Sequence, residues 1–163
     1  MIDKYIRKTY PETIIAYMAG IVDGEGALTS GSYAKAKNGN PWYTTYLIIS
    51  STDEILIDWL VNNFGSKKFT YTRKQIPGTS KKQVYKWQCT GERLLHICEL
   101  IYPYLVIKKR QSEIIMEMVK SGKQKFYSTG HSGPQVHPEV HELRANLCLE
   151  LRNLHARNGS LTN

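Results

Sequence analysis

The segment from Pro11 to Gly26 constrains the fold most, because an apolar helical pattern ends there in an abrupt glycine-rich turn. Proline suits the first turn of a helix, and apolar residues then recur every three or four positions, at Ile14, Ile15, Met18, Ile21 and Val22. Gly24 and Gly26 interrupt the pattern, so the sequence predicts a helix that ends near Glu25. Gly20 lies inside this helix, where glycine costs ~1 kcal/mol relative to alanine, so we expect a close contact to require it.

Two pairs of strands follow the first helix. Alternating side chains bounded by turn residues predict strands over about 27–37, 42–50, 68–74 and 83–90. Helical spacing predicts helices from a Ser51/Thr52 cap to Gly65 and over about 92–102, 111–120 and 138–158, with a connecting loop over 121–137. This order predicts an α+β fold of αββαββα type with additional C-terminal helices. Its four strands would form an antiparallel sheet with helices on one face.

The strands over 68–74 and 83–90 alternate in polarity. In the first strand we expect one set to face the core, namely Phe69, Tyr71 and Arg73, and the other to face outward, namely Lys68, Thr70, Thr72 and Lys74. In the second strand the inward set is Tyr85, Trp87 and Cys89, and the outward set is Lys86, Gln88 and Thr90. The outward face of the sheet is therefore predicted to be polar and basic.

The formal net charge of +8 is concentrated in the two strand pairs. Residues 27–52 contain two basic side chains and residues 65–91 contain seven, and neither stretch contains an acidic one. The rest of the chain has 13 basic and 14 acidic residues, so the excess lies wholly in these two blocks. Such a localised excess predicts a surface that binds a polyanion. Duplex DNA fits best, because a β-ribbon enters its ~12 Å major groove.

Composition indicates a folded protein inside a reducing compartment. Hydrophobic residues make up 41% of the 163 residues, which suits one domain over 1–163 with its core over about 10–120. No window approaches the ~20 apolar residues of a membrane span, and the N-terminus lacks the apolar region of a signal peptide. Cys89, Cys98 and Cys148 have no CxxC spacing and are expected to be buried thiols. We therefore expect an intracellular location, in the cytoplasm, nucleoid or an organelle, without secretion or membrane contact.

The nine residues from Met18 to Gly26, Met-Ala-Gly-Ile-Val-Asp-Gly-Glu-Gly, resemble the LAGLIDADG motif of homing endonucleases. Ala19, Gly20, Asp23 and Gly26 are identical to it. The order of elements over about 10–120 is also similar to that family, and a single copy of the motif implies a homodimer. The alternative interpretation is an ordinary amphipathic helix that ends in an acidic turn.

The resemblance implies that Glu25, at the eighth motif position, holds Mg²⁺ together with the backbone carbonyl of Gly24. Mn²⁺ is expected to substitute, and Ca²⁺ to bind without supporting cleavage. Ala19 and Gly20 have no bulk and would let two helices pack closely across a twofold axis. The predicted dimer interface consists of Met18, Ala19, Gly20 and Asp23. Paired Glu25 side chains would then hold two ions ~3.5–4 Å apart, as two-metal phosphodiester hydrolysis requires.

Two further candidate catalytic residues come from the same resemblance. Lys108, five residues after Pro103, matches a lysine that reaches toward the scissile phosphates; the alternative is a solvated helix start. Ser51 matches a residue at the strand-to-helix junction that contacts active-site water; the alternative is a plain helix cap. Asp53 and Glu54 stand where some members carry a basic residue, so the solvent network is expected to differ.

Outward strand positions supply the residues expected to contact DNA. Lysine suits guanine, glutamine suits adenine, and threonine suits either a hydrogen bond or the thymine methyl. The predicted set is Thr29, Tyr33, Lys35, Trp42, Thr44, Tyr46, Lys68, Thr70, Thr72, Lys74, Lys86 and Gln88. Trp42 and Tyr46 are equally consistent with packing at the sheet edge. His137 and His141 have the i,i+4 spacing of a zinc pair, but no HExxH pattern surrounds them and no zinc site is expected.

These expectations combine into a site-specific double-strand DNA endonuclease of the intron or intein homing type. It would hydrolyse phosphodiester bonds with Mg²⁺ at a long pseudo-palindromic target, because one motif per chain requires two half-sites. The alternatives are an RNA-splicing maturase of the same fold, which would bind intron RNA, and a DNA-binding regulator without cleavage activity.

Overall fold

The structure is a computed structural model that describes residues 9–33, 42–72, 82–123, 125–127 and 134–159. Its first elements are α1 (Glu12–Glu25), β1 (Gly26–Tyr33), β2 (Trp42–Ser51), α2 (Glu54–Phe64), β3 (Lys67–Thr72) and β4 (Gln83–Thr90). The later elements are α3 (Gly91–Ile101), the 3₁₀ turn η1 (Tyr102–Tyr104), α4 (Lys109–Ser121), β5 (Lys125–Tyr127), β6 (Pro134–Val136) and α5 (Pro138–Gly159). This succession confirms the predicted α+β fold of αββαββα type.

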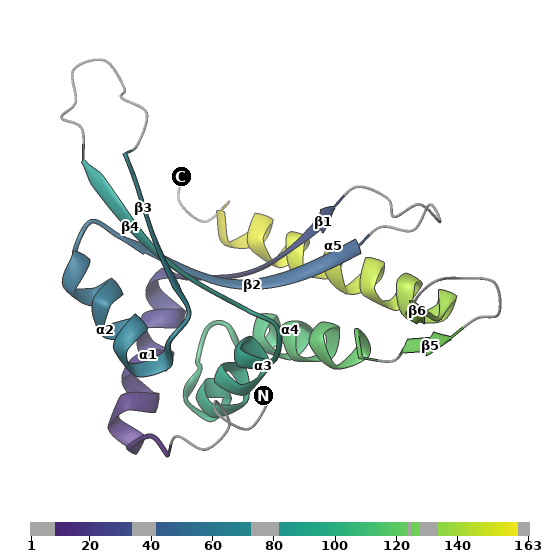
Figure 1. The fold of residues 1–163 in the computed structure, drawn as a ribbon, viewed down its shortest axis with the longest axis horizontal. Coiled ribbons are helices and arrows are strands. Elements are labelled where there is room, and N and C mark those ends of the chain that lie inside the picture. Colours follow the sequence, from purple (N-terminus) through teal and green to yellow (C-terminus); the bar gives the residue numbers. More distant parts are fainter. Residues whose placement is uncertain (1–8, 34–41, 73–81, 124, 128–133, 160–163) are drawn as a thin grey trace.

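The four long strands form one antiparallel sheet in the order β1-β2-β4-β3. Figure 1 shows α1 to α4 on one side of this curved sheet. Helix α5 packs on the same side, where the Ser30 hydroxyl of β1 donates to Cys148 Sγ (3.0 Å). We call this side of the sheet the helix-covered face and the opposite side the open face.

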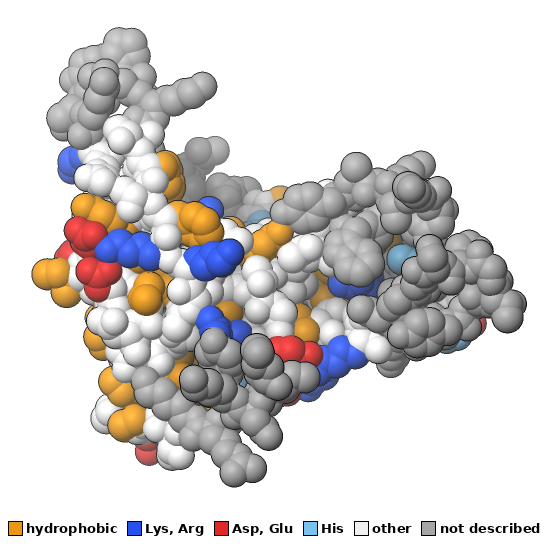
Figure 2. All heavy atoms as spheres, in the orientation of Figure 1, with side chains coloured by type: hydrophobic (Ala, Val, Ile, Leu, Met, Phe, Trp, Pro, Cys, Tyr) orange, Lys and Arg blue, Asp and Glu red, His pale blue; other side chains and the backbone are white. Residues whose placement is uncertain are grey.

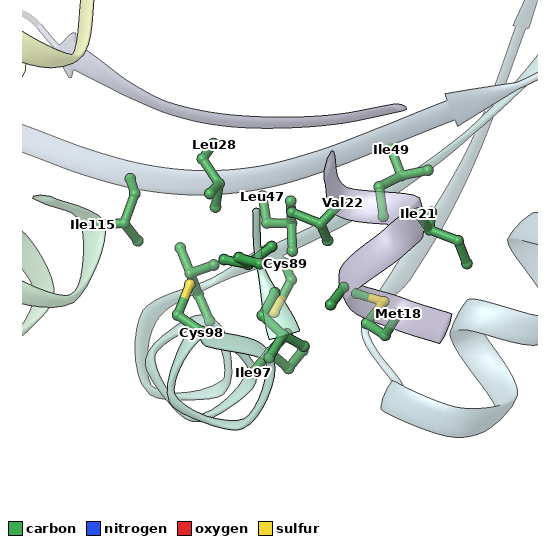
Figure 3. Close-up of a cluster of buried hydrophobic side chains, with 14 of the residues drawn as sticks. Met18, Ile21, Val22, Leu28, Leu47, Ile49, Cys89, Ile97, Cys98 and Ile115 are labelled. Atoms are coloured by element: carbon green, nitrogen blue, oxygen red, sulfur yellow. The ribbon is translucent and has the colours of Figure 1, made fainter. Parts of the chain in front are cut away.

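The hydrophobic core lies between the helix-covered face and the helices. Leu28, Leu47 and Ile49 of the sheet are fully buried, as are Trp87 and Cys89. Figure 3 shows Met18 and Val22 of α1 pointing into this cluster, next to Cys89 and Ile97. Met18 and Val22 are buried in this cluster, and their burial fixes the position of α1 against the sheet.

All three cysteines lie in this core as unpaired thiols, as predicted. Burial raises the pKa of Cys89 and of Cys98 to about 12. Both thiols therefore stay protonated at neutral pH and behave as small apolar side chains.

The structure corrects the predicted faces of β3. Its register pairs Lys68 with Trp87 and Phe69 with Lys86. Lys68 accordingly lies on the helix-covered face, with its ammonium 5.3 Å from the ring centroid of Tyr85, while the Lys86 ammonium lies 4.9 Å from the ring centroid of Phe69. Because side chains alternate along a strand, Thr70 and Thr72 lie on the same face as Lys68, and Tyr71 lies on the same face as Phe69.

The physical reason is a pair of carboxylates on α2. The Lys68 ammonium forms salt bridges with Glu54 and with Asp58 (2.6 Å), which lie one helical turn apart. These partners hold Lys68 over α2 and turn the aromatic side chains of β3 to the open face.

Two other elements differ from the sequence-based prediction. Helix α2 begins at Glu54 rather than at a Ser51/Thr52 cap, because the Asp53 carboxylate accepts the backbone N–H of Ile55 (2.9 Å). The predicted loop over 121–137 contains a short antiparallel pair, in which Lys125 of β5 lies opposite Val136 of β6. None of the described helices is long and apolar enough to cross a membrane.

The junction between α1 and β1 depends on the absence of a side chain at Gly26. An added Cβ at Gly26 would lie 2.7 Å from the carbonyl oxygen of Val22 and 2.8 Å from its Cα. Both are backbone atoms, so neither can move without unwinding the last turn of α1. The chain can therefore pass directly from helix to strand only with glycine at this position.

We predict that Gly26→Ala destabilises the protein by about 1–3 kcal/mol, because overpacking against backbone cannot relax. Gly31→Ala is the matched control in the same strand, since its Cβ would meet only the Tyr46 ring at an ordinary 3.8 Å. Removing glycine from a strand interior should leave the control equal to the native protein or up to about 1 kcal/mol more stable. Urea unfolding measures both, and equal destabilisation by the two changes would contradict the account.

Candidate active site and DNA-binding face

Helix α1 delivers Glu25 to the edge of the sheet. Glu25 is the last residue of the helix and is exposed, and the next residue, Gly26, begins β1 opposite Ile49. Figure 1 shows the C-terminal end of α1 meeting the sheet where β1 starts. Gly24 is also exposed, and an added Cβ there would meet no atom within 4 Å. A carboxylate and an accessible backbone thus stand together at the helix end.

Asp23 fixes the turn that precedes α4. The backbone N–H of Val106 donates to Asp23 Oδ2 (2.7 Å), and those of Ile107 (3.2 Å) and Lys108 (3.0 Å) donate to Oδ1. Three amides before a helix are thus satisfied by one carboxylate, which suits the partial positive charge of that helix end. Asp23 has a structural role inside its own chain.

The side chain of Lys108 binds the C-terminal end of α1. Its ammonium donates to the backbone carbonyls of Val22 (2.8 Å) and Asp23 (2.9 Å). Helix α1 has no basic residue in its own last turn, so Lys108 provides the positive charge that the helix C-terminus favours. The Lys108 side chain is half-buried and hydrogen-bonded to α1, whereas a lysine at a solvated helix start would be exposed.

The electrostatic environment of Lys108 is mixed. Burial lowers the pKa of its ammonium below the ordinary value, and the nearby carboxylates of Asp23 and Glu25 partly offset that shift. The charge of Glu25 thus favours the protonated form of Lys108. Asp23, Lys108 and Glu25 form one polar cluster at the end of α1, which we call the helix-end cluster.

Ser51 is the last residue of β2 and lies at the strand-to-helix junction where it was predicted. Its hydroxyl accepts the backbone N–H of Asp53 (2.9 Å), and it shares the helix-covered face with Ile49. This contact is the one that a plain helix cap would make, and a contact of Ser51 with active-site water stays a prediction. Ser50 is the serine on the open face, where it pairs with Lys86, one residue beyond the Gly26–Ile49 pair.

Two of the four residues predicted at a dimer interface belong to the chain's own core instead. Met18 is 0% exposed and Ala19 is 1% exposed, so neither is available to a partner. Gly20 is exposed, and an added Cβ would meet nothing within 4 Å. Asp23 is half-buried and bonded within the chain.

Gly20 belongs to a set of exposed glycine and apolar residues on α1 and on the two segments that contact α1, and we call this set the α1 outer face. Its other members are Ala16, Tyr17 and Gly24 of α1, Ile55 of α2, and Val106 and Ile107 before α4. Ile55 is 79% exposed and Val106 is 82% exposed, which is high for branched apolar side chains. The Tyr17 ring lies edge-on to Trp59 (4.9 Å between centroids), so it is held against α2. Exposed apolar side chains that gather on one part of a protein mark interaction surfaces.

The open face carries only part of the predicted DNA-contact set. Register and alternation place five of those residues there: Thr29, Thr44, Tyr46, Lys86 and Gln88. Lys68, Thr70 and Thr72 lie on the helix-covered face, as described above. Lys35 and Lys74 lie outside the described residues, and so do the side chains of Tyr33 and Trp42. The sequence-based prediction missed Lys67, Phe69 and Tyr71, and the acidic pair on α2 is the signal that would have placed them.

No group of three or more His, Cys, Asp or Glu side chains that could hold a metal ion occurs within the described part of the chain. His141 in particular is half-buried, and burial together with Arg144 lowers its pKa. Glu25 nevertheless fits a hard cation, because it is an exposed carboxylate that directly follows the exposed residue Gly24, whose backbone carbonyl is a second oxygen ligand of the kind Mg²⁺ prefers.

We predict that Asp23→Asn destabilises the protein by about 1–3 kcal/mol, because one carboxylate then no longer accepts three backbone amides. Asp58→Asn is the control, since the Asp58 side chain is 51% exposed in its salt bridge with Lys68 and its loss should cost less than about 1 kcal/mol. Chemical unfolding of both variants distinguishes them. A neutral Asp23→Asn would show that the turn before α4 does not depend on this carboxylate.

No model of a known protein family matches the sequence, and neither does any curated protein. Solved structures do resemble it. The homing endonuclease I-CvuI, in complex with a DNA target, has a TM-score of 0.64 at 17% identity over 88% of this chain and 83% of its own. The archaeal intron-encoded homing endonuclease I-Vdi141I, complexed with DNA, has a TM-score of 0.67 at 12% identity over 88% of this chain and 84% of its own.

A third similar structure is the LAGLIDADG homing endonuclease I-GzeII in complex with a DNA target. Its TM-score is 0.53 at 18% identity, over 85% of this chain and 43% of that protein. Identities this low establish an architecture rather than an activity. The helix that carries Glu25, the four-stranded sheet and the helices beneath it together give this chain the fold of the LAGLIDADG homing endonucleases.

Proposed function

We propose that this protein is a site-specific double-strand DNA endonuclease that acts as a homodimer and hydrolyses phosphodiester bonds with Mg²⁺ held by Glu25. The observation that carries the proposal is the helix-end cluster, in which Glu25 is exposed beside the Gly24 carbonyl while Asp23 and Lys108 fix the helix end. A carboxylate held this way, beside a sheet whose open face carries lysine, glutamine and threonine, suits a nucleic-acid backbone as substrate.

The α1 outer face supports the dimeric part of the proposal. A single chain contributes one Glu25, whereas cutting both strands of a duplex needs two. Packing two copies through Gly20 and Gly24 would bring the two helix C-termini together, because neither glycine has a side chain to separate the backbones. Tyr17, Ile55 and Val106 would then be covered by the partner.

Each residue of the helix-end cluster has a distinct part in the proposed reaction. Glu25 and the Gly24 carbonyl hold Mg²⁺, and Mn²⁺ substitutes for it, whereas Ca²⁺ binds without supporting cleavage. Bound Mg²⁺ would supply the positive charge that lowers the pKa of the attacking water and stabilises the leaving oxygen. Lys108 keeps α1 from fraying at its last turn and adds a cation near the phosphates. Asp23 keeps Lys108 in place.

The open face of the sheet is the surface that is proposed to bind DNA. The similar structures are homing endonucleases bound to DNA targets, and the proposed role of the sheet here is the same. Lys67 and Lys86 are the described lysines of this face, and no acidic residue belongs to β1, β2, β3 or β4. A twofold dimer would read two half-sites, which makes a pseudo-palindromic homing site the expected target.

We predict that Glu25→Gln abolishes Mg²⁺-dependent cleavage, by about 10²-fold or more, while DNA affinity is retained. The substitution keeps the size of the side chain and removes only its charge. Glu117→Gln, an exposed carboxylate on α4, is the matched control and should cleave normally. The assay uses a plasmid that carries a site selected by the native protein from a random library. Native-like cutting by Glu25→Gln would sink the metal assignment, and binding without cutting by the native protein would indicate a regulator instead.

We also predict that Gly20→Leu converts a dimer into a monomer without loss of fold. Leucine has room, since an added Cβ at Gly20 meets nothing within 4 Å in the chain, and it favours the helix by ~1 kcal/mol relative to glycine. Asn146→Leu, at an exposed position of α5, adds similar bulk away from the α1 outer face and should stay dimeric. Sedimentation and circular dichroism read the two properties separately. A native protein that is monomeric both free and on DNA would refute the dimer.

A further inference from the structure

The outer half of the open face, built by β3 and β4, combines aromatic with polar side chains. Phe69 is 39% exposed and Tyr71 is 43% exposed, both on the edge strand β3. On β4, Lys86 lies directly opposite Phe69, and Gln88 lies opposite Lys67. Figure 2 shows hydrophobic and basic side chains next to one another over this part of the molecule. An aromatic ring at the centre of a DNA-facing strand is thus exposed to the partner rather than buried.

Phe69 is held in place by its neighbour. The Lys86 ammonium lies over the ring, 4.9 Å from its centroid, in a cation–π contact. Lys86 therefore lies over one face of the ring, while part of Phe69 stays exposed. Beside the ring is a hollow of about 480 Å³, whose lining includes Phe69, Gln88, Thr90 and Lys67. A group from the major groove can approach Phe69 from this side.

We propose that Phe69 is a specificity-determining residue that reads the C5 methyl group of one thymine in each half-site. The inference rests on the proposed DNA-binding function and deepens it. Among the groups that the four bases present in the major groove, the thymine methyl is the apolar one, and phenylalanine contacts it where hydrogen-bonding side chains gain nothing. Phe69 has no role in the core, because it lies on the opposite face of the sheet from Trp87 and Cys89.

The same contact favours DNA over RNA. Uracil differs from thymine only by this methyl group, so an apolar reader of the methyl loses its partner in RNA. Loss of one buried methyl costs ~0.8 kcal/mol, which corresponds to about a fourfold change in affinity. That effect is small enough to leave binding intact and large enough to measure.

The test uses the full-length protein and a target that the native protein has selected from a random DNA library. Each thymine is replaced singly by uracil, and equilibrium affinity is measured in Ca²⁺. We expect one position per half-site at which uracil weakens binding by about fourfold. Phe69→Ala should bind more weakly overall and show no uracil penalty at that position. Phe69→Leu, which keeps an apolar side chain, should retain part of the penalty and guards against a folding defect.

Leu149→Ala is the matched control, because Leu149 is 56% exposed on α5 and lies away from the open face. It should keep both native affinity and the native uracil penalty. The inference is overturned if uracil is tolerated at every position, or if Phe69→Ala keeps the penalty. Failure of the underlying proposal looks different, because the native protein would then select no target at all.

Discussion

The reciprocal contact between Asp23 and Lys108 is the interaction on which the rest of this site depends. The carboxylate of Asp23 holds the backbone of residues 106–108, and the ammonium of Lys108 holds the carbonyls of Val22 and Asp23. Each of these two side chains belongs to the stretch of backbone that the other side chain binds. The two contacts therefore support each other. Segments more than 80 residues apart in the chain thus act as a single rigid support beneath Glu25.

Local chemistry explains which parts of this arrangement are readable from sequence. The end of α1 follows from apolar spacing and from glycines, and Gly26 is required because Val22 backbone atoms leave no room for a side chain. Lys108 and Asp23 could be named from the motif and the Pro103 spacing. Their mutual hydrogen bonds could not, because those depend on how α1 packs against the turn before α4.

The wrong predictions for β3 and for α1 share one physical origin. Alternation along a strand and spacing along a helix do not show what each face packs against. Phe69 and Tyr71 alternate with Lys68 in either orientation. The pairing of Lys68 with Trp87 places Lys68 over the carboxylates of Glu54 and Asp58 and leaves the aromatic set on the open face. Met18 and Ala19 belong to an apolar stripe that suits a core or an interface equally well, and burial assigns them to the core. Tertiary context decides such cases, and it also creates the exposed aromatic face on β3.

The most direct test of the central claim is the location of the metal ion in a crystal of the protein with its selected DNA. Anomalous scattering from Mn²⁺ shows that location without reference to activity. We expect manganese peaks about 2 Å from the Glu25 carboxylates of two chains, next to the Gly24 carbonyls and the scissile phosphates. Manganese bound elsewhere, with Glu25 free of any metal, would contradict it.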